Sequence, residues 1–480
     1  MSRRTKIVAT LGPAVDAPET LAELLNAGVD VARINFSHGA AEEHLQRITR
    51  LRETADKLGK VVAVLGDLPG PKLRVRLPEA RELVDGDTVH FSLNHEPGSA
   101  DELVITEPEL LADVRPGQRL LLDDGRLQLV ARATVGQRLS TRVLVGGTLH
   151  PNKGINLPDT QIQVPAVTPR DREALATAAR VGVDWLALSF VRGPEAAEEL
   201  RIAAAEFGLK VPVLAKIERP EAVRRVAAIV AAFDGIMVAR GDLGVEMPLE
   251  QVPTIQKSLI TEANTAGKPV ITATDMLDSM RNNPRPTRAE ASDVANAVYD
   301  GSDALMLSGE TAIGHYPIEA VRCMARIAEE TERHLFEVNR RQRSLELFQP
   351  GQEIVQQLAE ATVGLAENLG AAAIITPTRT GRTARLLTKY RPRTPVIALG
   401  PSPTILRRMA VYWGVLPVPL APLTPGDDRI VAAVRDAFAA NAVAVGDRVV
   451  VLAGHPVEGG RHYPTIRVVQ VGEGGASVAP

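Results

Sequence analysis

The sequence predicts an α/β protein whose largest part is a (β/α)8 barrel, with a small β-barrel lid domain inserted into it and a separate C-terminal α/β domain. Short β-rich apolar runs alternate with helical stretches, which is typical of parallel strands joined by crossover helices. One connection instead carries closely spaced turn signals and no long helix. At 480 residues the chain is also too long for a single compact core, so two to four domains are expected.

Eight apolar runs supply the predicted barrel strands, which is the number that closes a β/α barrel. These runs are residues 7–11, 29–36, 61–66, 185–190, 211–217, 235–239, 269–274 and 304–307. Helical stretches are expected between them at residues 17–27, 41–58, 169–181, 195–208, 220–232, 252–266 and 286–298. We therefore assign residues 1–70 and 166–345 to the barrel.

Residues 71–165 interrupt the barrel pattern after its third strand. Short alternating strands are separated by turn signals such as Asp123-Asp124-Gly125, which predicts a small β domain. Because barrel loops accept insertions on the face where active sites form, we expect this domain to act as a lid. A long helical stretch at 317–343 then leads to a new alternation, with strands expected at 372–376, 396–399, 415–418, 449–453 and 466–471. Residues 346–480 are assigned to the C-terminal domain.

Composition excludes several classes of function. A net charge of −3 creates no general attraction for nucleic acid or an anionic membrane surface. Cys323 is the only cysteine, which excludes an internal disulfide and fits a reducing compartment. The apolar run at residues 7–11 is too short for a signal peptide or a membrane span. We expect a cytoplasmic protein with neither nucleic acid nor membrane as a partner.

Polar residues stand at the carboxyl ends of the predicted strands, where β/α barrels place their catalytic groups. They are Thr10, Arg33, Asn35, Ser37, His38, Asp67, Ser189, Lys216, Glu218, Arg240, Asp242, Thr272, Thr274, Ser308 and Glu310. Glu218 and Asp242 on neighbouring strands suit Mg²⁺ or Mn²⁺, which prefer oxygen ligands. Lys216 and Arg33 would neutralise a phosphoryl group during its transfer. Any one of these residues alone is equally consistent with a barrel-end salt bridge, but their occurrence together favours a site.

At these residues the sequence resembles the pyruvate kinase family over nearly its whole length. The matching segments are 5–8 with Gly12-Pro13, 32–39, 216–218, 237–244, 286–290 and 307–311, in the family's order. The resemblance implies a glycolytic phosphotransferase that converts phosphoenolpyruvate and ADP to pyruvate and ATP. No P-loop, dinucleotide fingerprint or His-Glu-x-x-His motif occurs, so the nucleotide would bind without a P-loop.

The resemblance also implies roles for individual residues. Lys216 would lie at the transferring phosphoryl group, Arg33 would hold the phosphate, and Glu218 and Asp242 would bind Mg²⁺. Thr274, with Ser308 through water, would help to protonate enolpyruvate, and the amides of Gly241 and Asp242 would receive the substrate carboxylate. Arg240 completes the implied catalytic set. The implied nucleotide contacts are Thr10, Pro13, Asn35, His38, Arg74 and Lys153, and the implied monovalent-cation ligands are Asn35, Ser37, Asp67 and the carbonyl of Leu68.

Lys72 departs from the family pattern, because potassium-dependent members carry Glu at its position. A lysine ammonium there could supply what K⁺ would supply. Binding K⁺ as well would bring like charges together at a cost of about 4 kcal/mol at ~4 Å and an effective dielectric near ~20. We therefore predict that K⁺ is not required; the alternative is that Lys72 merely faces solvent. Asp275 also departs, since it stands where the family usually has Gln.

The segment Thr378, Arg379, Thr380, Gly381, Arg382 and Thr383 is expected to bind a phosphorylated effector. Its hydroxyls, guanidinium groups and helix amides would form a phosphate cradle, although a plain helix cap is the alternative. Family members use this loop for a sugar bisphosphate, but residues 458–464, which bear on the ligand's far end, are not diagnostic. The ligand is therefore open among a sugar bisphosphate, a sugar monophosphate and a nucleotide. The resemblance also implies a homotetramer.

Two other classes of protein fit parts of the pattern. A barrel carbon–carbon lyase or carboxylase acting on phosphoenolpyruvate or pyruvate would also place Mg²⁺ ligands, Arg and Thr at strand ends. Lys153 in the inserted lid and the Ser37-His38 pair instead favour a nucleotide partner. A catalytically inactive scaffold is disfavoured by the joint presence of Lys216 and its neighbours. An ADP-to-ATP assay separates these alternatives.

Overall fold

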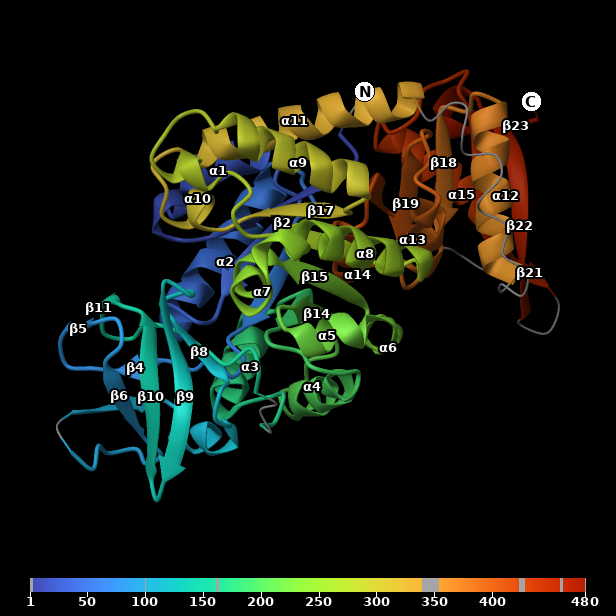
Figure 1. Cartoon of the computed structure of the whole chain (residues 1–480). Coiled ribbons are helices and arrows are strands. Elements are labelled where there is room, and N and C mark those ends of the chain that lie inside the picture. The colour runs from blue at the N-terminus through green and yellow to red at the C-terminus, as the bar shows by residue number, and fades with distance from the viewer. Residues whose placement is uncertain are drawn as a thin grey trace.

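The computed structural model describes residues 3–99, 101–160, 164–338, 354–422, 428–457 and 461–479. Its centre is a closed barrel of eight parallel strands (Figure 1). The strands are β1 (Lys6–Thr10), β2 (Val31–Asn35), β3 (Ala63–Leu68), β13 (Trp185–Leu188), β14 (Val213–Ile217), β15 (Gly235–Ala239), β16 (Val270–Ala273) and β17 (Ala304–Leu307). Each strand pairs with the next one along the chain, and β17 closes on β1. The predicted (β/α)8, or TIM, barrel is confirmed.

The helices form the outer layer of the barrel. They are α1 (Pro18–Ala27), α2 (Ala41–Lys57), α3 (Pro169–Val181), α4 (Glu195–Glu206), α5 (Pro220–Arg224), α6 (Val226–Ala232), α8 (Val252–Thr265), α9 (Arg288–Asp300) and α11 (Pro317–Val338). Thr168 and Thr287 begin α3 and α9 with capping boxes. The single helix predicted at 220–232 was wrong, because Arg225 leaves the helical conformation and divides α5 from α6. Residues 339–343 of the long predicted helix lie outside the described residues.

Two short helices at the carboxyl end of the barrel were not predicted. Helix α7 (Arg240–Glu246) directly follows β15. Helix α10 (Gly309–Ala312) is separated from β17 by one residue, Ser308. Their Gly residues and short length gave no helical periodicity to detect. These helices fix the backbone around Asp242 and Ser308 at the mouth of the barrel.

The barrel strands are almost wholly buried. Helices cover the outer face of the sheet, and the side chains of the remaining barrel strands fill the space at its inner face. Ile7 and Ala9 pack outward against the helices, whereas Val8 packs inward. The inward side chains form a hydrophobic core that continues into the C-terminal domain through residues such as Tyr412. At the amino-terminal end of the barrel strands, the inward side chains therefore pack against the C-terminal domain.

The inserted domain is a nearly closed, barrel-like sheet, as expected. Its seven-stranded sheet has the order β12-β8-β9-β10-β6-β7-β4, and β11 and β5 form a separate pair. A bridge between Arg74 and Gly154 brings the two edges of the larger sheet together. The strands are β4 (Val75–Arg76), β5 (Arg81–Leu83), β6 (Thr88–Ser92), β7 (Glu102–Ile105), β8 (Arg119–Leu122), β9 (Leu127–Val135), β10 (Arg138–Val145), β11 (Gly147–Leu149) and β12 (Ile155–Asn156).

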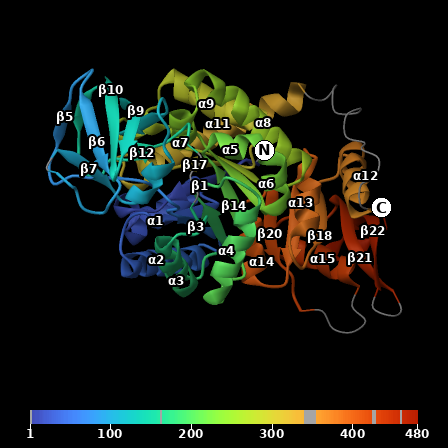
Figure 2. The ribbon, with the colours of Figure 1, turned by 60° about the horizontal axis from the view of Figure 1, so that its bottom comes forward.

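The C-terminal domain is a six-stranded sheet with helices on its faces. Its strand order is β20-β19-β18-β21-β22-β23, built from β18 (Ala373–Pro377), β19 (Val396–Gly400), β20 (Val415–Pro419), β21 (Arg448–Val457), β22 (Arg461–Val471) and β23 (Ser477–Val478). The helices are α12 (Ile354–Asn368), α13 (Arg382–Lys389), α14 (Pro403–Met409) and α15 (Arg429–Ala439). Figures 1 and 2 show the lid and this domain at opposite ends of the barrel. Across the described part of the chain, no helix is long and apolar enough to cross a membrane.

Candidate active site

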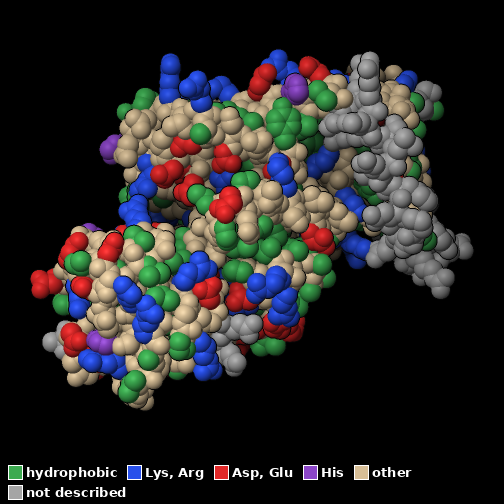
Figure 3. Space-filling model, in the orientation of Figure 1, with side chains coloured by type: hydrophobic (Ala, Val, Ile, Leu, Met, Phe, Trp, Pro, Cys, Tyr) green, Lys and Arg blue, Asp and Glu red, His purple; other side chains and the backbone are tan. Residues whose placement is uncertain are grey.

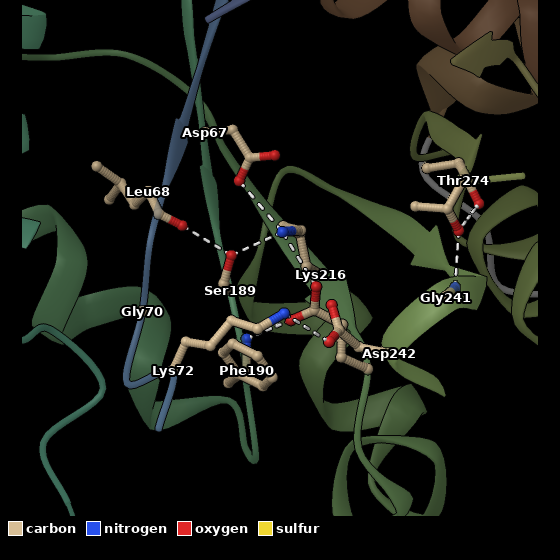
Figure 4. Close-up of polar contacts among 12 residues, drawn as sticks. Asp67, Leu68, Gly70, Lys72, Ser189, Phe190, Lys216, Gly241, Asp242 and Thr274 are labelled. Atoms are coloured by element: carbon tan, nitrogen blue, oxygen red, sulfur yellow. Dashed lines mark hydrogen bonds and ion pairs between the residues drawn. The ribbon is translucent and has the colours of Figure 1, made fainter. Parts of the chain in front are cut away.

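Lys216 lies at the centre of a cluster of polar groups at the carboxyl end of the barrel (Figure 4). Its Nζ lies 2.7 Å from Ser189 Oγ, 3.0 Å from Glu218 Oε1 and 3.3 Å from Asp67 Oδ1. Burial acts to lower the pKa of Lys216, but the Asp67 and Glu218 carboxylates outweigh it and raise the pKa. Lys216 is therefore a fixed cation at neutral pH. Around this end of the barrel, Figure 3 shows a hollow bordered by acidic and basic side chains.

Asp67 on β3 joins Lys216 to Arg33 on β2. Arg33 Nε lies 2.7 Å from Asp67 Oδ2, and Arg33 Nη1 donates to Thr10 Oγ1 at 3.0 Å. Burial acts to raise the pKa of Asp67, but Lys216 and Arg33 lower it more. One buried carboxylate thus orients two cations, and the arrangement suits an anion such as a phosphoryl group.

Glu218 and Asp242 provide a fit for a hard divalent cation. Glu218 Oε2 accepts from the backbone N–H of Phe190 at 2.6 Å, whereas buried Oε1 makes no well-angled hydrogen bond. Burial raises the pKa of Glu218, Lys216 opposes this effect, and the nearby Asp242 carboxylate adds to it. A divalent cation between these carboxylates would satisfy Oε1 and relieve their repulsion. The described residues contain no cluster of three or more metal-binding side chains, but Mg²⁺ needs only one or two carboxylates beside water and substrate oxygens.

Thr274 occupies a strained turn immediately after β16. Its φ is 69° and that of Asp275 is 54°, both in the left-handed region that non-glycine residues rarely adopt. Thr274 Oγ1 accepts from the backbone N–H of Gly241 at 2.7 Å, which ties the turn to α7. Arg240 donates to the carbonyl of Thr274 at 2.7 Å and pairs with Asp293 at 2.6 Å. Arg240 therefore holds the Thr274 turn in place.

Ser308 lies between β17 and α10, beside the turn that follows β16. Its backbone N–H donates to Glu310 Oε2 at 2.7 Å, while Glu310 Oε1 accepts from the N–H of Leu277 at 3.1 Å. Glu310 thus links the two loops that carry Ser308 and Thr274. Sequence reasoning placed Glu310 at a strand end without this linking role, which depends on a contact between distant segments.

Lys72 forms an ion pair that sequence reasoning did not anticipate. Its Nζ lies 3.1 Å from Oδ1 of Asp242, one of the two candidate metal ligands, so Lys72 does not simply face solvent. Of the predicted monovalent-cation ligands, Asp67 contacts Lys216 directly and Leu68 is joined to it through Ser189. Leu68 O accepts from Ser189 Oγ at 2.7 Å, and Asn35 Oδ1 accepts from the N–H of Ser37 at 3.1 Å.

Among the predicted nucleotide contacts, Arg74 and Lys153 lie on the lid and His38 lies on the barrel near Arg74. Burial lowers the pKa of His38, and the charges of Arg74 and Arg170 lower it further, so the imidazole is neutral at pH 7 in a positively charged region. Arg74 Nη1 donates to Asn152 O at 2.9 Å, and Lys153 pairs with Asp123 at 2.6 Å. Pro13 is exposed in the single turn that follows β1.

The predicted effector loop precedes helix α13. Thr378 Oγ1 accepts from the N–H of Gly381 at 3.0 Å, and Thr380 Oγ1 accepts from that of Arg382 at 3.4 Å. Gly381 has a φ of 82°, which favours glycine at this helix start. Thr378 and Arg379 line a cavity of about 290 Å³ with Arg429. In the segment 458–464, which would face the far end of the effector, residues 458–460 lie outside the described residues.

The fold defines the class as a closed β/α barrel, and the paired cations and paired carboxylates at its carboxyl end suit a phosphoryl group and a divalent metal. Residues 2–321 match the family model for the pyruvate kinase barrel domain, and residues 356–469 match that for the pyruvate kinase alpha/beta domain. The chain belongs to the pyruvate kinase family.

Curated relatives agree with this assignment along almost the whole chain. Over 462 residues it is 45% identical to the pyruvate kinase of Geobacillus stearothermophilus, covering 95% of this chain and 78% of the relative. It is 46% identical over 462 residues to pyruvate kinase 2 of Synechocystis sp., covering 95% and 77%. It is 43% identical over 459 residues to the pyruvate kinase of Methylorubrum extorquens, covering 95% of each chain.

Proposed function

We propose that this chain is an active pyruvate kinase, which transfers the phosphoryl group of phosphoenolpyruvate to ADP and yields pyruvate and ATP. The observation that carries the proposal is the position of Lys216, held between Asp67, Ser189 and Glu218 at the mouth of the barrel. Membership of the family supports the same activity. The step belongs to glycolysis, and the single cysteine supports a cytoplasmic location.

In the proposed mechanism, Arg33 and Lys216 bind the phosphoryl oxygens and compensate their charge during transfer. Glu218 and Asp242 would hold Mg²⁺ or Mn²⁺, which supplies further charge compensation when bound. The backbone N–H groups of Gly241 and Asp242 receive the substrate carboxylate, which would replace Thr274 Oγ1 as the acceptor of the Gly241 N–H. Arg240 keeps the Thr274 turn in position, and Arg74, His38 and Lys153 contact the nucleotide where the lid meets the barrel.

After transfer, the enolate of pyruvate must take up a proton at its methylene carbon. We assign delivery of this proton to Thr274 Oγ1, acting through water together with Ser308. Thr274 is held by Gly241 N–H at 2.7 Å, and Glu310 joins its loop to that of Ser308. Glu310 therefore holds together the two loops that carry these hydroxyl groups.

A coupled assay that follows ATP formation from phosphoenolpyruvate and ADP tests the proposal. We expect turnover that depends on ADP, phosphoenolpyruvate and Mg²⁺ together. A carbon–carbon lyase or carboxylase would consume its substrate without ADP, and an inactive scaffold would show no turnover. Either result contradicts the proposed activity.

We also propose that turnover does not require K⁺. Lys72 supports this proposal because its ammonium already lies 3.1 Å from Asp242, inside the active site. The ligands that would hold K⁺ have donors of their own: Asp67 pairs with Arg33 and Lys216, and Leu68 O accepts from Ser189. A cation placed there would meet Lys216 at close range, which costs several kcal/mol.

The test compares turnover in potassium and tetramethylammonium buffers at equal ionic strength. We expect rates within about twofold for the wild type, and potassium activation in Lys72→Glu, which removes one positive charge and adds a negative one. Activation of the wild type by K⁺ of about tenfold or more contradicts the proposal.

Regulation by a phosphorylated effector at residues 378–383 is a further part of the proposed function. The cavity beside Thr378 and Arg379, together with Arg429, supports it, whereas the bonds from Thr378 and Thr380 to the loop's own amides also suit a plain helix cap. Calorimetry with a sugar bisphosphate, a sugar monophosphate and a nucleotide tests the site. We expect one ligand to bind and Arg379→Ala to weaken it, while exposed Arg393→Ala has no effect. If none binds, the loop is only a cap.

We also propose that the chain forms a homotetramer, which rests on the family resemblance alone. Analytical ultracentrifugation of the full chain tests it. A sedimenting species near four times the chain mass of 51.4 kDa is expected, and a monomer or dimer at micromolar concentration contradicts it.

A further inference from the structure

Glu246 is a buried carboxylate at the end of α7, the helix that carries Gly241 and Asp242. Its exposed fraction is 3%, and it shares the buried side of this short helix with Leu243. Burying an ionisable side chain is costly unless its neighbours compensate the charge. A glutamate at this position therefore needs partners that an apolar residue would not need.

The partners of Glu246 come from the lid and from the segment after β14. Glu246 Oε1 accepts from Asn156 Nδ2 at 2.9 Å and lies 3.5 Å from Arg219 Nη1. Arg219 is itself only 5% exposed, and its Nη2 donates to the carbonyls of Leu157 at 3.2 Å and Thr160 at 3.4 Å. We call the three side chains of Asn156, Arg219 and Glu246 the lid anchor, because they tie the chain that leaves the lid to the barrel.

The members of the lid anchor depend on one another for charge compensation. Burial raises the pKa of Glu246, while the charge of Arg219 and the hydrogen bond from Asn156 oppose this effect. Glu246 Oε2 is buried and has no hydrogen-bond partner among the described residues. Loss of either partner would leave the carboxylate still less compensated, which is costly. The carboxylate therefore holds both partners in place.

Both connections between the lid and the barrel pass the lid anchor. Residues 71–73 of the first connection and 155–157 of the second line one cavity together with Arg219 and Glu246. The volume of this cavity is about 20 Å³, which is space for a single water molecule. The two connections are thus packed closely around the anchor.

The lid anchor is joined to both candidate metal ligands through the main chain. Arg219 directly follows Glu218. Glu246 ends the short helix near whose start Asp242 lies, and residues four apart in a helix share a side. Lys72, in the first lid connection, pairs with Asp242 at 3.1 Å (Figure 4). A shift of the lid relative to the barrel would therefore act on Asp242 through both Lys72 and Glu246.

We propose that Glu246 is a positioning residue, which together with Arg219 and Asn156 couples the placement of the lid to the geometry of the metal ligands. The inference rests on the proposed function, where Glu218 and Asp242 are assigned as the ligands of Mg²⁺ or Mn²⁺. Glu246 acts through the helix that carries Asp242, and Arg219 acts through its neighbour Glu218. Removal of a group that orients metal ligands typically costs about 10- to 100-fold in metal affinity or activity.

Mn²⁺ binding to the full chain, followed by electron paramagnetic resonance without substrates, tests the proposal independently of turnover. Glu246→Ala removes the carboxylate and should weaken Mn²⁺ binding by about tenfold to a hundredfold. Glu246→Gln keeps an oxygen that can accept from Asn156, so its effect should be smaller. Asn156→Ala removes the lid's contribution without changing α7 and should weaken Mn²⁺ binding by about threefold to tenfold, the loss of one hydrogen bond.

Hydrogen exchange of the two lid connections, residues 71–73 and 155–157, supplies a second readout. If lid placement and metal binding are coupled, Mn²⁺ slows exchange at these residues in the wild type. The same addition should leave exchange unchanged in Glu246→Ala at an Mn²⁺ concentration that saturates this variant. A merely structural role would raise exchange in the variant without removing its response to the metal.

The matched control is Glu332→Gln, which also neutralises a buried carboxylate but at the amino-terminal end of the barrel. Glu332 is 4% exposed and accepts from the backbone N–H of Arg4 at 2.8 Å. This variant should unfold at lower denaturant concentration and bind Mn²⁺ as the wild type does. Should Glu246→Ala fail to fold, Glu246→Gln and Asn156→Ala decide.

Three results would overturn the role of Glu246. They are wild-type Mn²⁺ affinity in the Glu246 and Asn156 variants, an equal loss of affinity in Glu332→Gln and Glu246→Gln, and no effect of Mn²⁺ on exchange of the lid connections in the wild type. A wild type that binds Mn²⁺ but forms no ATP overturns the proposed function alone, because the Mn²⁺ titrations still decide the role of Glu246. A wild type that binds no Mn²⁺ overturns both.

Discussion

At the scale of single residues, the candidate active site depends on charges that fix one another. Asp67 contacts Arg33 with one carboxylate oxygen and Lys216 with the other, and both contacts are buried. Neither cation can turn away without leaving a buried carboxylate with less compensation, which is costly. The two cations are thus held in place before a substrate arrives, as electrostatic preorganisation requires.

Lys216→Met removes one of these fixed charges. We expect turnover to fall by about 10²–10³, the usual cost of losing one preorganised group at a developing anion. Circular dichroism should show the fold retained, because Arg33 still pairs with Asp67. The matched control is Lys57→Met on the exposed surface of α2, which should leave turnover unchanged. A rate for Lys216→Met within threefold of the wild type contradicts the assigned role.

Asp242→Ala tests the metal ligands. Glu218 alone would hold Mg²⁺ more weakly, so the Mg²⁺ concentration for half-maximal activity should rise by at least about tenfold, or activity should be lost. The measurement is an Mg²⁺ titration at saturating substrates. Glu250→Ala, at an exposed position near α7, is the control. An unchanged titration for Asp242→Ala rules out the metal role.

At the scale of elements, the turn after β3 packs directly against Ser189, which follows β13. Gly70 has a φ of 63°, and a Cβ added there would lie 2.9 Å from Ser189 Cβ and Ser189 O. Ser189 in turn holds Lys216 at 2.7 Å. The close approach of the turn to Ser189 thus bears directly on the position of Lys216.

Gly70→Ala should therefore lower both stability and turnover. The left-handed backbone costs about 1–2 kcal/mol and the contact with Ser189 adds about 1–3 kcal/mol. Gly59→Ala is a matched control, since Gly59 has the same φ of 63° but no atom within 4 Å of the added Cβ. We expect both variants to unfold at lower denaturant concentration and only Gly70→Ala to lose activity. Equal turnover in the two variants would show that the Ser189 contact is unimportant.

At the scale of the whole molecule, the barrel lies between the inserted domain and the C-terminal domain. The lid contacts the carboxyl end, where Asn156 donates to Glu246 at 2.9 Å. The C-terminal domain contacts the amino-terminal end, where Arg407 pairs with buried Asp184 and Arg391 pairs with buried Asp303, each at 2.8 Å. The candidate active site and these contacts with the C-terminal domain therefore lie at opposite ends of the same strands.

Arg391→Ala tests how much these contacts stabilise the assembly of domains. Arg391 bonds to Asp303, Asn264 and the carbonyl of Gly301, and it stacks over Trp413 at 5.2 Å. Its removal leaves Asp303 without its cation, so we expect a loss of about 3–5 kcal/mol in denaturant unfolding. The exposed neighbour Arg393→Ala should change stability by less than about 0.5 kcal/mol. A loss for Arg391→Ala as small as that of the control contradicts the stabilising role.

The sequence by itself determined the barrel, its eight strands and the residues at their ends. Strand runs such as 235–239 and 304–307 were predicted at the observed bounds, because buried parallel strands are continuous apolar segments that end at polar residues. Since carboxyl ends of barrel strands meet at one rim, the order of Arg33, Lys216 and Glu218 along the chain was enough to predict that they share a site. The break at Arg225 and the short helices α7 and α10 were not predicted, because helices of four to seven residues carry too little periodicity.

Only the tertiary structure decided which of these groups touch. Lys72 and Asp242 are separated by 170 residues, and Arg240 and Asp293 by 53, so no local pattern relates them. The first pair depends on how the lid packs against the barrel, and the second depends on how the segments after β15 and β16 pack against each other. The lid anchor was not predicted for the same reason, because Asn156 and Glu246 come from the lid and the barrel and meet only when these pack together. Periodicity specifies the faces of single elements, whereas contacts between distant elements are set by packing.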